Sequence, residues 1–134
     1  MSSLGVAGNG GEAQGRADAQ AWLQHWLAAR RWQRRVERAL ARFDLSFFQW
    51  LVLDSLAILH RETSDAVSQV QVCRRLELGK ASISRLMTRL EGRGLVDIAP
   101  AWPTKEYRIY LTREGEALLA EGAVVVEMVS RTAR

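Results

Sequence analysis

Residues 79–96, which read GKASISRLMTRLEGRGLV, decide the fold of this 134-residue chain. Apolar side chains recur in this stretch at steps of three and four, the spacing of an amphipathic helix. They are Ile83, Leu86, Met87 and Leu90. Gly94, a usual stop signal, follows them. The stretch therefore predicts a helix that begins at Lys80, ends before Gly94 and packs one face against a core.

The other side of this helix carries short hydrogen-bonding side chains and cations. Ser and Thr reach base edges or phosphates at close range, and Arg pairs bidentately with guanine in a major groove. The residues concerned are Lys80, Ser82, Ser84, Arg85, Thr88 and Arg89. This pattern fits a helix that enters the major groove of DNA. An ordinary solvated amphipathic helix would give the same pattern in this segment alone.

Two helix starts are marked upstream by the same device. Ser46 with Gln49, and Ser68 with Gln71, have the spacing of a capping box, in which each side chain bonds the backbone N–H of the other. These pairs predict one helix from about residue 47 to 59 and a short one that ends near residue 76. Residues 77–79 leave room only for a tight turn, so the pattern is that of a helix-turn-helix.

The segment downstream predicts a β-hairpin and a last helix. Residues 95–98 and 107–111 have strand character, and a turn with two prolines separates them. Thr112 then caps a helix that runs through about residue 129. A hairpin directly after a helix-turn-helix is the arrangement of a winged helix, in which the wing lies against adjacent DNA backbone. We therefore expect a mainly α fold with a small β wing.

Residues 45–119 resemble the winged-helix core of the MarR family of bacterial transcriptional regulators. The similar segments are LSFFQWLVLDSL, LELGKASISRLMTRLEGRGLV and YLTREGEALL. The resemblance implies DNA contacts at Lys80, Ser82, Ser84, Arg85 and Arg89, and a wing contact at Lys105.

The wing departs from the family pattern. Members usually carry an Asp-x-Arg signature before the second wing strand, where this chain has Pro103, Thr104 and Lys105. Because lysine lacks the planar fork of arginine, we expect a plain phosphate contact from Lys105.

Composition and resemblance together divide the chain into four segments. Residues 1–19 are rich in Gly, Ser and Ala and predict a flexible arm. Residues 20–43 form an N-terminal dimerisation helix, residues 44–111 the DNA-binding lobe, and residues 112–134 a C-terminal dimerisation helix. The family dimerises through its first and last helices. A two-fold dimer sets its recognition helices about 34 Å apart on a pseudo-palindromic duplex.

The first long helix also suggests a small-molecule site. It carries an apolar stripe rich in tryptophan and several arginines on the opposite side. The resemblance implies a crevice for small aromatic or phenolic acids, with aromatic walls and a cation for the carboxylate. Candidate contacts are Trp22, Trp26, Arg30, Trp32, Arg34 and Trp50. Core packing of the tryptophans and a solvated arginine face are the alternatives.

The composition of the chain permits nucleic-acid binding and gives no sign of metal binding. The net charge of +4 and isoelectric point near 10.0 permit nucleic-acid binding. Cys73 is the single cysteine, and with only His25 and His60 beside it no metal-binding spacing exists. We expect no cofactor, no enzyme activity, no membrane segment and a cytoplasmic protein.

Two alternatives stay open. Cys73 is predicted to face the core of the helix-turn-helix, which leaves a redox switch as a minor hypothesis because a sensing thiol needs exposure. The missing wing signature favours, as the main alternative function, a winged helix that binds proteins rather than DNA.

Overall fold

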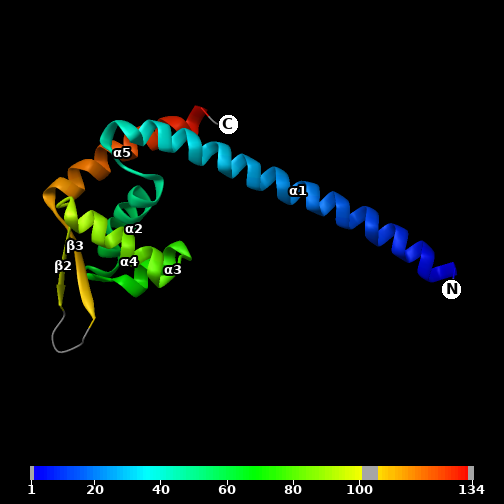
Figure 1. The fold of residues 1–134 in the computed structure, drawn as a ribbon, viewed down its shortest axis with the longest axis horizontal. Helices are drawn as coiled ribbons and strands as arrows, with labels where there is room; N and C mark the ends of the chain where they lie inside the picture. Colours follow the sequence, from blue (N-terminus) through cyan, green and yellow to red (C-terminus); the bar gives the residue numbers. More distant parts are fainter. Residues whose placement is uncertain (1, 101–105, 133–134) are drawn as a thin grey trace. The chain divides into compact units, whose positions relative to one another are not determined.

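The computed structural model describes residues 2–100 and 106–132, with side chains from residue 10 onward. Contacts divide the chain into two compact units, Met1–Arg35 and Val36–Arg134. The elements, drawn in Figure 1, are α1 (Ser2–Leu40), η1 (Ala41–Phe43), α2 (Phe47–Thr63), β1 (Val67–Ser68), α3 (Gln69–Leu76), α4 (Lys80–Gly92), β2 (Val96–Pro100), β3 (Tyr107–Leu111) and α5 (Arg113–Thr132). The expected winged helix-turn-helix is confirmed.

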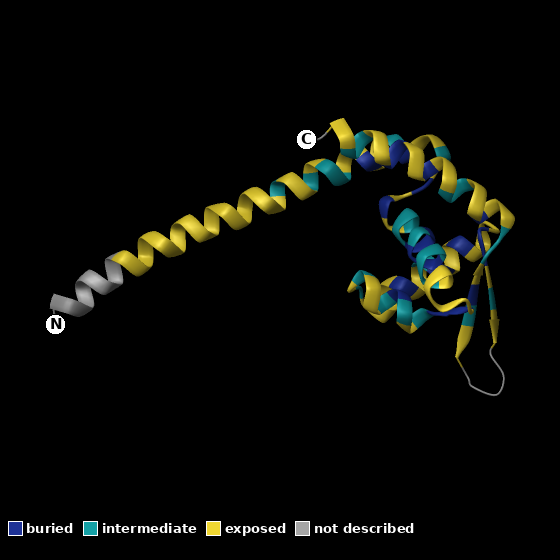
Figure 2. Ribbon diagram, turned by 180° about the vertical axis from the view of Figure 1, so that it is seen from behind, coloured by how far each residue is buried: buried dark blue, intermediate teal, exposed yellow. Residues whose placement is uncertain are grey.

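The first unit consists of most of α1. This helix begins at Ser2, so the segment predicted as a flexible arm, residues 1–19, is helical from residue 2 onward. Extending an existing helix gains one hydrogen bond for each residue fixed, whereas starting one is costly. A helix formed after Gln20 can therefore extend toward the N-terminus at little cost. A bond of 3.0 Å from Gln14 Nε2 to Asp18 Oδ1 supports the extension, which Figure 2 shows as exposed from residue 10 to 26.

The second unit is built on a core that α1, α2, α3 and α4 share. The apolar stripe predicted on the first helix is buried here at Val36 and Leu40, each with no exposed surface. Side chains from the three following helices complete this core. They include Val52, Leu53, Leu56, Val72, Ile83, Met87 and Leu90, all at 2% exposure or less. The apolar face predicted for α4 is therefore the buried one, apart from the partly exposed Leu86.

Both predicted capping boxes are formed. Ser46 Oγ accepts from the N–H of Gln49 at 3.0 Å and Gln49 Oε1 accepts from the N–H of Ser46 at 3.0 Å. Ser68 and Gln71 make the same pair of bonds at 3.3 and 2.8 Å. The turn before α4 opens at Glu77, which has a left-handed φ of 53°. These local bonds fix where α2 and α3 begin and leave three residues between α3 and α4.

A three-stranded antiparallel sheet carries the wing, in the order β1, β3, β2. Ile109 at the centre of β3 lies opposite Val67 on one side and Ile98 on the other. The strands β2 and β3 follow the prediction, whereas β1 was not predicted. Lys105, the predicted wing contact, lies outside the described residues.

The start of α5 is hydrogen-bonded to Gly94 and Leu95, the residues that lead from α4 into β2. Thr112 Oγ1 donates to the carbonyl of Gly94 at 2.6 Å and accepts from the N–H of Gly115 at 3.0 Å. The N–H of Thr112 donates to the carbonyl of Leu95 at 3.1 Å. Thr112 thus caps α5 as predicted and ties it to the start of the wing.

Candidate nucleic-acid interface

The helix α4 divides its side chains between the core and the solvent. Ile83, Met87 and Leu90 are buried against the lobe, with at most 2% of their surface exposed. The polar side chains of α4 that were predicted to face DNA are all exposed, namely Lys80, Ser82, Ser84, Arg85, Thr88 and Arg89. Because α4 follows a tight turn and is held by its apolar face, this polar face is rigidly presented.

A hollow lies on each side of α4. The first, of about 600 Å³, lies between α3, the start of α4 and β3, and includes Lys80 and Ser84 in its lining. The second, of about 310 Å³, includes Ser82, Arg85 and Arg89. The predicted contacts on α4 other than Thr88 therefore each line one of the two hollows. The helix forms a ridge between them, a shape that a DNA groove with flanking phosphate backbones can accept.

The start of α4 is held without a side-chain cap. Gly79 is its N-cap and makes no side-chain bond. Gln69 Nε2 donates to the carbonyl of Lys80 at 3.3 Å, which joins α3 to the first turn of α4. Uncapped N–H groups at a helix start are suited to phosphate oxygens. Together with the exposed Lys80 they give this end of the helix anion-binding character.

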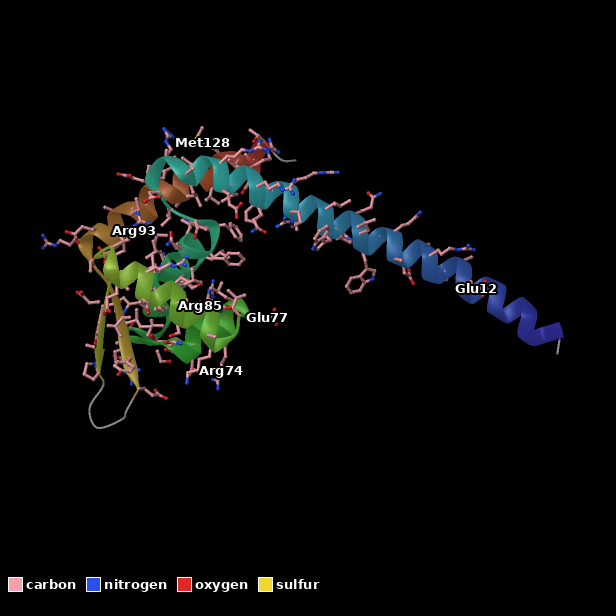
Figure 3. The ribbon with its side chains drawn as sticks, in the orientation of Figure 1. Glu12, Arg74, Glu77, Arg85, Arg93 and Met128 are labelled. Atoms are coloured by element: carbon pink, nitrogen blue, oxygen red, sulfur yellow. The ribbon has the colours of Figure 1, made fainter. Side chains whose placement is uncertain are left out.

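Two side chains on the polar face bond back to their own helix. Arg85 Nε donates to the carbonyl of Ala81 at 3.4 Å, and Thr88 Oγ1 donates to the carbonyl of Ser84 at 3.0 Å. Figure 3 labels Arg85 on α4 and Arg74 on α3. These bonds restrict where the two side chains point, which lowers the entropy lost when either side chain binds a ligand.

The structure adds Arg74 and Cys73 to this surface. Cys73 was predicted to face the core, whereas in the structure this residue is only half-buried and lines the larger hollow together with Arg74. Val72 fills the core position instead, with no exposed surface.

The predicted ligand contacts fall in both compact units. Trp22 and Trp26 are 77% and 58% exposed within the first unit, and the Arg30 guanidinium lies 5.8 Å from the centre of the Trp26 ring. Trp32 and Arg34 belong to the same unit. The sixth residue, Trp50, lies in the second unit, where its Nε1 is buried and finds no acceptor among the described residues.

A cavity of about 460 Å³ lies between α2, β3 and α5 in the second unit. Its lining combines apolar residues such as Leu56 and Leu119 with the charged Asp54, Arg61 and Glu116. Burial raises the pKa of Asp54, although the charges of Arg75 and Arg61 act in the opposite direction. The sequence did not reveal this cavity, because its walls come from α2 on one side and from β3 and α5, much later in the chain, on the other.

The described part of the chain also bears on metal binding and on membrane insertion. No group of three or more His, Cys, Asp or Glu side chains there could hold a metal ion. No single described helix is long and apolar enough to cross a membrane. One bent pair, Gly10–Phe43 with Phe47–Thr63, reaches that length and composition only when its two helices are counted together. Much of the apolar surface of the second of these helices lies in the lobe core.

A family model and curated relatives each match part of the chain. The model of the MarR family matches residues 43–101. An HTH-type transcriptional regulator of Bacillus cereus is 36% identical over 80 residues, which are 60% of this chain and 50% of the relative. The chain thus spans about half the length of the curated relatives it matches most strongly.

Solved structures share the fold. MarR of E. coli in complex with operator DNA superposes with a TM-score of 0.72 at 20% identity, over 84% of this chain and 78% of that one. BpsR of Bordetella bronchiseptica, whose DNA binding is regulated by 6-hydroxynicotinic acid, superposes with a TM-score of 0.74 at 21% identity. That match covers 85% of this chain and 83% of BpsR.

Proposed function

Because the model of the MarR family matches residues 43–101 of the chain, we propose that it is a sequence-specific regulator of transcription that binds double-stranded DNA. In the full proposal it is a homodimeric repressor that a small aromatic or phenolic acid releases from a pseudo-palindromic operator. The recognition surface is the polar face of α4.

The observation that carries the proposal is the division of α4 into a buried apolar face and an exposed polar one. Arg85 and Arg89 are exposed beside one hollow, and Lys80 and Arg74 beside the other. Arginine on an exposed helix face can read guanine, while lysine and uncapped N–H groups hold phosphates. The surface thus supplies both sequence reading and positioning.

The proposal is tested by the affinity of the full chain for duplex DNA at several salt concentrations. Arg85→Ala should lower the affinity for the preferred site about ten- to a hundredfold and should make the protein less selective between DNA sequences. Lys105→Ala should weaken all duplexes alike and lower the salt dependence by about one phosphate contact. Arg113→Ala, which removes an exposed arginine of α5, is the matched control. If Arg85→Ala and Lys105→Ala both bind as the parent does, the lobe is a protein-interaction module instead.

Exposed apolar side chains support pairing of two copies. Trp22 and Trp26 on α1 are exposed, as are Val124 and Met128 on α5, which are 57% and 62% exposed. Large apolar side chains of this kind are typical of an interface. Figure 3 labels Met128 on α5. The double variant Val124→Glu and Met128→Glu should sediment as a monomer while the parent sediments as a dimer, and a dimeric variant would exclude α5 from the interface.

The ligand part of the proposal rests on the seam between α2 and α5. The buried Nε1 of Trp50 would be satisfied by a carboxylate oxygen, and Gly122 of α5 lies directly against this indole. We propose that 6-hydroxynicotinic acid or a related aromatic acid lowers the affinity for DNA by a population shift. Trp50→Phe, which keeps a ring and removes the donor, should weaken this response, and an equal response would contradict the role of Trp50.

A further inference from the structure

Arg93 follows α4 and reaches across to the joint between α1 and α2. Its Nη1 donates to the carbonyl of Asp44 at 2.5 Å and to Gln49 Oε1 at 3.4 Å, and its Nη2 donates to the carbonyl of Phe43 at 3.2 Å. Figure 3 labels Arg93 near the C-terminal end of α4. One side chain therefore connects segments that lie 44 to 50 residues apart in the sequence.

The acceptors are backbone groups that the helix end leaves without partners. The last carbonyls of a helix have no N–H to bond within the helix. The carbonyls of Leu40 and Ala41 are bonded by the N–H groups of Leu45 and Asp44, at 3.3 and 2.9 Å. The carbonyls of Phe43, the last residue of η1, and of Asp44, its C-cap, accept from Arg93 instead. A cation is also favoured at this end by the helix dipole, so Arg93 acts as the C-terminal cap of the α1–η1 segment.

The same guanidinium extends the capping box at the start of α2. Gln49 Oε1 accepts from the N–H of Ser46 at 3.0 Å as well as from Arg93. The end of α1, the start of α2 and the end of α4 thus meet at one side chain. Only a planar fork with several N–H groups can serve these acceptors together, because the three donors of lysine radiate from one nitrogen.

We propose that Arg93 is a positioning residue that fixes the angle between the recognition helix α4 and the C-terminal end of α1. This inference rests on the proposed function, in which α1 takes part in the dimer and α4 reads DNA. Fixing that angle sets the distance between the two recognition helices of a dimer. Arg93 would thereby determine which spacing of half-sites the protein accepts, without touching DNA.

The experiment measures affinity for duplexes that contain the two half-sites of the preferred DNA sequence. The spacing between the half-sites is lengthened or shortened by one or two base pairs. The full chain is compared with Arg93→Gln, Arg93→Lys and the control Arg113→Gln. The preference is the ratio of the affinity at the best spacing to the affinity at the altered spacings. Arg93→Gln should reduce this ratio about fivefold, because the loss of one hydrogen bond changes an affinity by about that factor. Its salt dependence should equal that of the parent, because no phosphate contact is lost. Arg93→Lys should retain part of the preference and Arg113→Gln all of it.

A merely stabilising role would lower the affinity for every spacing alike and leave the preference unchanged, which would overturn the inference. A salt dependence lowered by about one phosphate would also overturn it, because Arg93 would then bind DNA directly. If urea unfolding shows that Arg93→Gln is not folded, Arg93→Lys decides the question: an unchanged preference rejects the inference and a preference lowered at least twofold supports it. A parent chain that selects no DNA sequence refutes the proposed function itself, and this inference with it.

Discussion

Replacing Gly115 by alanine tests the packing that joins α5 to the wing. A Cβ at this buried position would lie 2.0 Å from the carbonyl oxygen of Leu95 and 3.0 Å from its carbonyl carbon. An ordinary contact between carbon and oxygen is about 3.3 Å or longer. The backbones of α5 and Leu95 must therefore separate by roughly 1 Å to admit one methyl group.

The surrounding bonds resist this separation. The carbonyl of Leu95 is held by the N–H of Thr112, and Thr112 Oγ1 bonds both Gly94 and Gly115. Overpacking costs about 1–3 kcal/mol and each weakened bond about 1 kcal/mol. The higher helix propensity of alanine stabilises the folded state by about 1 kcal/mol and offsets part of this cost. We expect Gly115→Ala to lower the free energy of unfolding by about 3 kcal/mol and the Tm by about 10 °C.

Urea unfolding followed by far-ultraviolet circular dichroism, at a fixed protein concentration, measures the change. Gly92→Ala is the matched control, because nothing lies within 4 Å of a Cβ at this last residue of α4. It should be neutral or stabilise the protein by up to about 1 kcal/mol. A Gly115→Ala variant with the unfolding midpoint of the parent would show that α5 does not approach Leu95 as closely as described.

Three further substitutions test local features of the lobe. Ser46→Ala removes the capping box of α2 and should cost about 1 kcal/mol in urea unfolding; no loss would mean that the cap contributes nothing to stability. Glu77 has a left-handed φ of 53°, which glycine adopts without strain, so Glu77→Gly should raise the free energy of unfolding by about 0.5–1 kcal/mol. A lower free energy of unfolding would show that the backbone at Glu77 is not strained. Burial raises the pKa of Asp54, so the folded chain binds this proton more tightly than the unfolded chain, and its contribution to stability is lost as the pH rises through the folded pKa. Asp54→Asn should therefore gain stability relative to the parent from about pH 4 upward, and a constant difference across pH would contradict this sign.

Local patterns predicted most of the elements, because their causes lie within a few residues. Ser46 and Ser68 each find their capping partner three residues later, and both boxes are formed. The helix α4 follows the spacing of its apolar residues, and its buried face is the predicted one. Burial of one face and exposure of the other is a property that helical periodicity expresses directly.

Features that depend on distant partners were not predicted. The strand β1 has only two residues and exists because Val67 pairs with Ile109, far along the chain. The bonds of Arg93 to Phe43 and Asp44, and the close approach of Gly115 to Leu95, have no signature in the local sequence. The helical start of α1 was missed for another reason: glycines lower local propensity, but extension from a formed helix offsets that cost.

Selection of bound duplexes from a random pool, by the parent chain and by Arg85→Ala, tests most directly whether the polar face of α4 reads DNA. The account predicts that the parent enriches a pseudo-palindrome whose half-site centres lie about one helical turn apart, and that Arg85→Ala loses that enrichment. A parent that enriches nothing, or the same palindrome from both proteins, would contradict it.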